Sequence, residues 1–150
     1  MRFRLSPIGI VSDIEKAFLN IGLQTKDRDV TRFLWVKDTM IKSLTNNIQT
    51  YRFCRIPFGV ISSPFLLGAT ITYHLQQIGT PLAGQVLRNI YVDNIITGAQ
   101  TLNEAKYLYN ETKMIFATAS MNLQEWASNS QDLMDFIPVK DRADQIRVVI

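Results

Sequence analysis

Two short apolar runs separated by an Asp-Asn pair most strongly constrain the fold of this 150-residue chain. Residues 90–92 and 95–97 are rich in β-branched and aromatic residues, which favour strands. Asp93 and Asn94 tolerate the positive φ of a tight turn, so we expect a β-hairpin with a carboxylate at its tip. A carboxylate held in this way is suited to bind a metal ion against a phosphate. An ordinary structural turn is the alternative interpretation.

A second acidic residue, Asp13, lies far upstream at another change of pattern. The apolar run at residues 8–11 is typical of the end of a strand. Apolar residues then recur at helical spacing, at Ile14, Ala17, Phe18 and Ile21. We therefore expect Asp13 at the junction of a strand and a helix, where a helix N-cap is the simplest interpretation of Asp13 alone.

The rest of the sequence alternates strand and helix patterns without linkers or repeats. Residues 31–36 and 50–56 favour two strands, which the polar region around Asn46 joins as an antiparallel pair. A helix is predicted from Ser63, as an N-cap followed by proline, to Gly79.

A further helix follows a capping box at residues 101–104. Its apolar face runs from Ala105 to Ala119. Together these elements predict an α+β fold, in which both helices pack on one face of an antiparallel sheet and the other face stays open to a ligand.

Composition excludes several classes of protein. An apolar content of 47% is sufficient for a hydrophobic core, and the length suits one domain or part of one. A single cysteine, Cys54, and a single histidine, His74, exclude an internal disulfide and a Cys/His zinc cluster. The net charge of +3 is consistent with a nucleic-acid partner but is shared by many other proteins. We expect no membrane span and, from the polar start, no signal peptide.

Three motifs in a fixed order resemble the palm motifs of reverse transcriptases. Residues 13–18 resemble the first, an Asp followed five residues later by an aromatic residue. Residues 57–64 resemble the second, in which Pro-aromatic-Gly leads into a helix that begins at Ser-Pro, and residues 91–94 resemble the Tyr-X-Asp-Asp box with its last residue changed. Flanking segments are similar to the polymerase of BEL/Pao long-terminal-repeat retrotransposons, at residues 2–5, 27–35 and 120–126.

The resemblance implies a polymerase palm with a short fingers hairpin and a two-metal reaction. It implies that Asp13 and Asp93 bind two Mg²⁺ ions, or Mn²⁺, and that the backbone carbonyl of Ile14 is an additional ligand. Asn94 completes the catalytic set at a position where these enzymes usually carry Asp. Because an amide keeps an oxygen ligand but removes a negative charge, we expect weaker metal binding rather than none.

The resemblance also implies a set of substrate-binding residues, namely Ala17, Phe18, Phe58, Gly59 and Tyr91. Phe18 matches an aromatic residue whose ring excludes a 2′-hydroxyl and so selects deoxynucleotides, although its helical spacing also suits a core position. Phe58 and Gly59 match positions beside the nucleotide and the template base, where glycine permits close approach of the backbone, with a plain turn as the alternative. Lys16 and Arg55 suit either phosphate contacts or solvated surface charge.

The implied partners are an RNA or DNA template with its primer, deoxynucleoside triphosphates, and a polyprotein that supplies fingers, thumb, RNase H and integrase. The implied location is intracellular, in cytoplasmic virus-like particles or the nucleus, without secretion. Over residues 1–150 we expect a partial reverse transcriptase domain that lacks the N-terminal fingers, thumb and RNase H. Because backbone phosphate contacts carry most of the affinity for nucleic acid, we expect this piece to be inactive alone.

Two alternatives to an RNA-directed DNA polymerase remain open. The chain could be an inactive remnant of a decayed element, or a non-catalytic nucleic-acid-binding module, since palm sheets resemble RNA-binding sheets. Alanine at Asp13 and Asp93 separates the second alternative from the enzyme. A pure binder keeps its affinity, whereas a polymerase loses Mg²⁺-dependent nucleotide binding.

Overall fold

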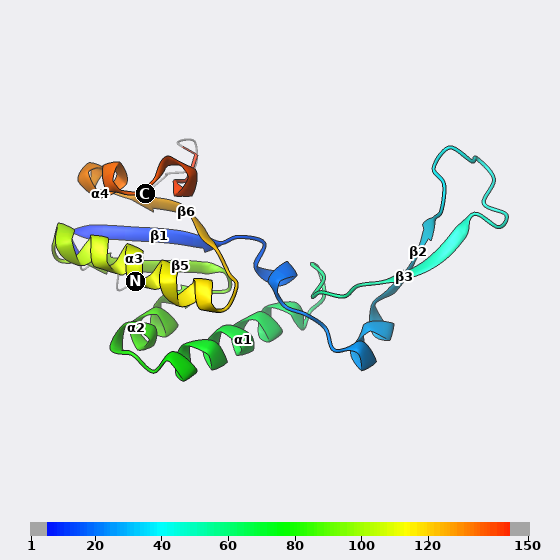
Figure 1. Ribbon diagram of the computed structural model, residues 1–150, viewed down its shortest axis with the longest axis horizontal. Coiled ribbons are helices and arrows are strands. Elements are labelled where there is room, and N and C mark those ends of the chain that lie inside the picture. Colours follow the sequence, from blue (N-terminus) through cyan, green and yellow to red (C-terminus); the bar gives the residue numbers. More distant parts are fainter. Residues whose placement is uncertain (1–5, 145–150) are drawn as a thin grey trace.

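A four-stranded antiparallel sheet forms the body of the computed structural model, which describes residues 6–144 (Figure 1). The spatial order of its strands is β4 (Ile90–Tyr91), β5 (Asn94–Ala99), β1 (Ile8–Ile14) and β6 (Leu123–Ser128). β1 pairs with both β5 and β6, so the first strand within residues 6–144 lies inside the sheet. The flanking segment at residues 2–5 lies outside the described residues.

The two central strands give the sheet one covered face and one open face. Along β1 and β5, buried and half-buried residues alternate, as the two-residue period of a strand requires. The covered face carries Ile10, Ser12, Ile14, Ile95, Thr97 and Ala99. Val11, Asp13, Asn94 and Ile96 lie on the other face and remain half-buried. The predicted α+β fold with one open sheet face is therefore confirmed.

Three helices build the covered side: α1 (Ser63–Ile78), α2 (Pro81–Asn89) and α3 (Leu102–Thr118). α2 and α3 contact β5, and α1 packs against α2, so the predicted layer contains one more helix than expected. The start of α2 repeats the signal that marked α1, because Thr80 precedes Pro81 and its hydroxyl accepts a hydrogen bond from the Ala83 N–H at 3.2 Å. None of the helices within residues 6–144 has the length and apolar character needed to cross a membrane.

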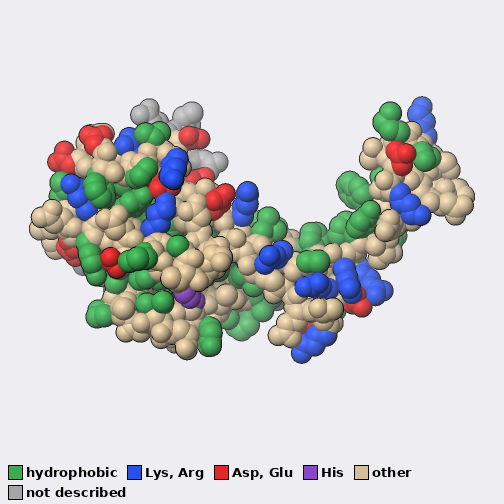
Figure 2. All heavy atoms as spheres, in the orientation of Figure 1, with side chains coloured by type: hydrophobic (Ala, Val, Ile, Leu, Met, Phe, Trp, Pro, Cys, Tyr) green, Lys and Arg blue, Asp and Glu red, His purple; other side chains and the backbone are tan. Residues whose placement is uncertain are grey.

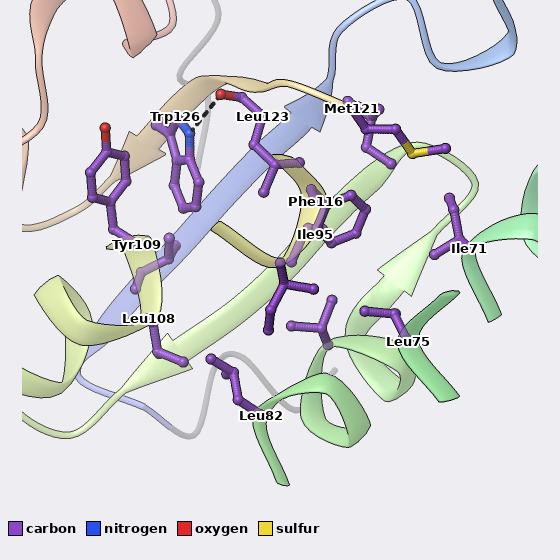
Figure 3. Packing of buried hydrophobic residues seen from close by; sticks show 14 of the residues in the cluster. Ile71, Leu75, Leu82, Ile95, Leu108, Tyr109, Phe116, Met121, Leu123 and Trp126 are labelled. Carbon is purple, nitrogen blue, oxygen red and sulfur yellow. Dashed lines mark hydrogen bonds between the residues drawn. The ribbon is translucent and has the colours of Figure 1, made fainter. Parts of the chain in front are cut away.

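Large side chains from the helices and the sheet interlock in one core (Figure 3). Trp126 of β6, Phe116 of α3 and Leu75 of α1 are each at most 2% exposed. A short helix, α4 (Gln131–Phe136), adds Leu133 to this core and packs against α3 and β6. At about 25 cal/mol per Å² of buried apolar surface, such contacts are the main stabilising contribution to the body.

The helix ends follow the sequence closely. The Thr101 N-cap is confirmed, because its hydroxyl accepts a hydrogen bond from the Glu104 N–H at 3.2 Å, whereas the Glu104 carboxylate accepts from the Gln100 N–H at 2.7 Å and not from the Thr101 N–H of a regular capping box. Gly79 ends α1 with a φ of 66°, as predicted. The predicted N-cap of α1 was one residue late: Ser62 occupies the cap, and the Ser63 hydroxyl instead donates to the Pro57 carbonyl at 2.8 Å. This bond ties the start of α1 to the turn at residues 57–59.

The predicted helix after Asp13 is wrong. β1 continues through Asp13 to Ile14, and only a short 3₁₀ helix, η2 (Ala17–Asn20), follows. Pairing on both sides keeps the end of β1 extended, and the Glu15 N–H still donates to the Asn122 carbonyl at 2.9 Å. Asp13 is consequently a strand residue and not a helix N-cap.

An arm projects from the body as an antiparallel pair of strands, β2 (Arg32–Val36) and β3 (Ile48–Arg52) (Figure 1). The pair was predicted, although β3 begins and ends earlier than expected. Ile48 already pairs with Val36, and after Arg52 the Phe53 N–H donates to the Thr31 hydroxyl at 3.1 Å rather than to β2. A second 3₁₀ helix, η3 (Thr25–Thr31), leads into the arm.

The arm is exposed on both faces and is held by local contacts. The rings of Phe33 and Tyr51 stack across the two strands with centroids 5.8 Å apart. Asp29 forms ion pairs with Arg32 at 2.9 Å and with Arg52 at 2.6 Å. Lys and Arg side chains gather where the arm joins the body (Figure 2). A lone two-stranded hairpin is marginally stable in water, so these contacts matter locally.

A buried ionic cluster fastens the C-terminal part of the described chain to α3. Asp141, in the 3₁₀ helix η4 (Val139–Asp141), is 5% exposed. It accepts a hydrogen bond from the Tyr109 hydroxyl at 2.7 Å and also contacts the Lys113 ammonium. Burial alone would raise the pKa of Asp141, but the bonds from Lys113 and Tyr109 outweigh it and hold that pKa below its ordinary value.

We expect Asp141→Asn to lower the free energy of unfolding by about 1–3 kcal/mol at pH 7, because Lys113 and Tyr109 then lose a charged acceptor. A carboxyl group whose pKa is lowered by folding stabilises the fold at pH values above its pKa in the unfolded chain, about 3.9. This contribution disappears as the pH falls through the pKa of the folded state. The difference between variant and wild type should therefore shrink in acid. Urea unfolding of both proteins at pH 7 and pH 3 measures this difference in the free energy of unfolding.

The control for this prediction is Asp144→Asn, which neutralises an exposed carboxylate three residues away. Its stability should match the wild type at both pH values. A difference for Asp141→Asn that is the same at pH 7 and pH 3 would contradict the ionic interpretation.

Candidate functional site

The register of two strands brings the predicted acidic residues together at one end of the open sheet face. Asp13 of β1 is the direct cross-strand partner of Asn94 of β5. Side chains opposite each other in an antiparallel pair have Cβ atoms about 4.5–5.5 Å apart. Asp93 precedes Asn94, and its backbone carbonyl accepts a hydrogen bond from the Ile14 N–H at 3.0 Å. The structure thus brings Asp13, Asp93 and Asn94 into one site.

The hairpin that carries Asp93 is confirmed, but its turn lies one residue earlier than predicted. Tyr91 pairs with Asn94, so Val92 and Asp93 form the two-residue turn. Val92 has a φ of 57°, a left-handed conformation that is costly for a β-branched residue. The register between Asp13 and Asn94 and the bond from Ile14 fix the turn at this place. Backbone strain of this kind often lies at functional sites.

Asn94 orients the neighbouring acid. Its side-chain amide donates a hydrogen bond to the Asp93 carboxylate at 3.0 Å. An aspartate at position 94 could not donate this bond, and its charge would repel Asp93. The amide therefore has a positioning role in addition to offering an oxygen to a ligand.

Asp13 is in an environment that disfavours an uncompensated negative charge. Burial raises its pKa most, the charges of Asp93 and Glu125 raise it further, and a hydrogen bond from the Ile14 backbone partly offsets them. One oxygen of Asp13, Oδ1, is buried without a hydrogen-bond partner. An unpaired buried carboxylate oxygen is costly, and a cation beside it would remove that cost.

These residues fit a hard divalent cation such as Mg²⁺. The donors are carboxylate and amide oxygens, which are the ligands that Mg²⁺ prefers, and Asp13 has an oxygen to spare. Within residues 6–144, no three His, Cys, Asp or Glu side chains are grouped as a metal site. Mg²⁺ commonly uses only one or two carboxylates and completes its shell with waters and substrate phosphates. The ligand role of the Ile14 carbonyl stays a prediction.

An aromatic pair lies just beyond Asp13 along the chain. Ala17 and Phe18 are buried in η2, and the Phe58 ring meets the Phe18 ring edge-on with centroids 4.8 Å apart. Phe58 is 67% exposed and Phe18 is 7% exposed, so Phe58 covers Phe18 from the solvent side. This burial agrees with the core interpretation of Phe18, and its sugar-sensing role stays a prediction.

The backbone conformation of Gly59 favours glycine. Its φ is 81°, in the left-handed region that favours glycine. An added Cβ would find no protein atom within 4 Å, and the approach of this backbone to a nucleotide or template base stays a prediction. The conformation of the turn selects glycine.

The remaining predicted residues lie on the surface. Tyr91 is 75% exposed at the edge of the sheet. Lys16 forms an ion pair with Glu15 at 3.6 Å, and Arg55 donates to the Asn20 carbonyl at 3.3 Å. These contacts support the surface-charge interpretation of Lys16 and Arg55.

One acidic residue near the site, Glu125 of β6, was missed by the sequence analysis. Its charge acts on Asp13, as described above. The sequence signal that could have indicated it is the spacing of two large apolar residues, Leu123 and Trp126. Residues three positions apart lie on opposite faces of a regular strand, so two core residues at this spacing indicate a bulge between them.

The strain at Val92 gives a prediction. A left-handed conformation costs a residue with a Cβ about 1–2 kcal/mol, and glycine loses about 0.5–1 kcal/mol through its greater freedom in the unfolded chain. We therefore expect Val92→Gly to raise the free energy of unfolding by up to about 1.5 kcal/mol. Urea unfolding measures the change. Val92→Ala keeps a Cβ and serves as the control, and an equal gain in both variants would contradict the prediction.

Comparison with known proteins gives one family. The family model described as reverse transcriptase (RNA-dependent DNA polymerase) matches residues 4–126. The matched span contains Asp13, the turn at residues 57–59 and the hairpin of β4 and β5. No curated protein matches the chain.

Proposed function

We propose that the open sheet face of this chain, which belongs to the reverse transcriptase (RNA-dependent DNA polymerase) family, carries the centre for deoxynucleotide transfer to a primer 3′-hydroxyl. The observation that carries the proposal is the direct pairing of Asp13 with Asn94, next to Asp93. This pairing joins the first and third motifs, which are separated along the chain by about eighty residues. The unpartnered Oδ1 of Asp13 supports it.

In this proposal Asp13 and Asp93 hold two Mg²⁺ ions, or Mn²⁺. When bound, the ions supply charge compensation on the attacking and leaving oxygens of phosphoryl transfer. The chain itself supplies rigidity: the Ile14 N–H fixes the backbone of Asp93, and the Asn94 amide fixes its carboxylate. Ligands held in this way need not reorganise during the reaction.

Substrate contacts are proposed on either side of the acids. Ala17 and Phe18 follow Asp13 by four and five residues, and Phe58, which precedes Gly59, contacts the Phe18 ring. A ring at Phe18 would discriminate against a 2′-hydroxyl by exclusion, without a hydrogen bond. Tyr91, exposed next to the turn, completes the proposed set of substrate contacts.

We further propose the biological context that the sequence indicates. The flanking segments favour a BEL/Pao retrotransposon origin, with fingers, thumb, RNase H and integrase in the same polyprotein. The location would be intracellular, in cytoplasmic virus-like particles or the nucleus. A template and primer are the proposed nucleic-acid partners, and the basic residues where the arm joins the body support this (Figure 2).

We expect Asp13→Asn and Asp93→Asn each to reduce Mg²⁺-dependent primer extension by about a hundredfold or more, because each removes a carboxylate from the cation site. The measurement is single-nucleotide extension by a longer protein that contains this chain, since the chain alone is expected to be inactive. Asp132→Asn, an exposed site in α4, is the control. Retention of extension in both variants would contradict the proposed centre.

The same variants separate the enzyme from a non-catalytic nucleic-acid-binding module. In a pure binder, Asp13→Asn leaves the affinity for primer and template unchanged or improved, since a negative charge near phosphates is removed. In the proposed enzyme, Mg²⁺-dependent binding of nucleotide is lost. Fluorescence anisotropy with labelled primer-template and with labelled nucleotide gives the two readouts.

We expect Phe18→Leu to lower the preference for deoxynucleotides over ribonucleotides by about tenfold or more, because leucine keeps the apolar contact but lacks the ring. The readout is the ratio of kcat/KM values for the two sugars. Tyr107→Leu removes an exposed ring on α3 and serves as the control. An unchanged ratio in Phe18→Leu would restrict Phe18 to the core role.

A further inference from the structure

A β-bulge in β6 lies beside Asp13. Two residue steps along β1, from Val11 to Asp13, span three steps along β6, from Ala127 to Gln124. The extra residue falls at positions 125–126, where Glu125 has a left-handed φ of 51°. Bulges are common next to active sites, where they re-aim a side chain.

This bulge determines the face on which Glu125 lies. Regular alternation from the buried Leu123 would turn residue 125 toward the helices and residue 126 toward the open face. Instead, Trp126 is 2% exposed and packs in the same core as Leu123 (Figure 3). Glu125 and its neighbour Gln124 are both half-buried. The bulge therefore keeps a carboxylate off the covered side of the sheet.

The register places Glu125 next to Asp13 on the side away from Asn94. Across the sheet, Asn94 pairs with Asp13, and Asp13 pairs with Gln124. Glu125 follows Gln124 directly in the sequence. Its charge is close enough to contribute to the raised pKa of Asp13, after burial and the charge of Asp93.

We propose that Glu125 is an additional carboxylate of the cation site, and that it supplies negative charge which Asn94 lacks. This inference rests on the proposed function. Within residues 6–144 no three acidic side chains are grouped as direct ligands, so Glu125 acts on the cation through its charge. Attraction of this kind is screened by salt more strongly than direct coordination is.

The test measures Mn²⁺ binding by the full 150-residue chain at low and at high salt. The signal is the electron paramagnetic resonance of the Mn²⁺ that remains free. We expect Glu125→Gln to weaken binding about threefold or more at low salt, with a smaller loss at high salt. Asn94→Asp in the Glu125→Gln background should restore the affinity, because it returns one negative charge. Glu111→Gln, the same change on α3 across the sheet, should have no effect.

Two further variants make each result decisive. Glu125→Asn is also neutral and suits a left-handed backbone, so it gives the same readout if Glu125→Gln unfolds. Asp13→Asn tests the cation site itself. If Asp13→Asn abolishes Mn²⁺ binding and both neutral variants at position 125 bind like the wild type, the inference is wrong and the proposed function stands. If Asp13→Asn binds like the wild type, the cation site and the proposed function both fail.

Discussion

The pairing of β1 with β5 is the constraint on which the rest of the site depends. Because side chains alternate between the two faces of a strand, a shift of one residue would move Asp13 to the helix-covered face and expose Ile14. The buried row of Ile10, Ser12 and Ile14 opposes such a shift, since it would transfer apolar side chains to water. The hydrophobic core on one face of the sheet therefore fixes the position of a charged group on the other face.

The site is built at some expense of stability. Asp13 has a buried oxygen without a partner, Asp93 and Glu125 add like charge, and Val92 and Glu125 adopt left-handed backbone conformations. Each of these features is unfavourable alone, and each lies within a few residues of the paired acids. The large core of α1, α3 and β6 offsets them. Concentration of unfavourable features at one place is what a site prepared for a positively charged ligand requires.

Local sequence signals predicted the elements that short-range chemistry determines. A Ser-Pro pair, a Thr-x-x-Glu sequence and β-branched runs identified α1, α3 and the hairpin of β4 and β5, and the similar Thr80-Pro81 pair would have identified α2. The helix expected after Asp13 failed because pairing with two strands distant in sequence outweighed the helical spacing of Ile14, Ala17 and Phe18. The contribution of Glu125 was hidden for a similar reason, since a bulge is defined by its partner strand. Motif order joined Asp13 to Asp93, but periodicity alone could not.

The exposed arm has a consequence for how the molecule opens. β2 and β3 contact each other and η3, whereas their contacts with the body are sparse, so the arm can separate its strands without disturbing the core. Amide protons of β2 and β3 would then exchange with solvent far faster than those of β1, and proteases would cut first between residues 37 and 47. The arm and the sheet are thus two cooperative units of unequal stability within one chain.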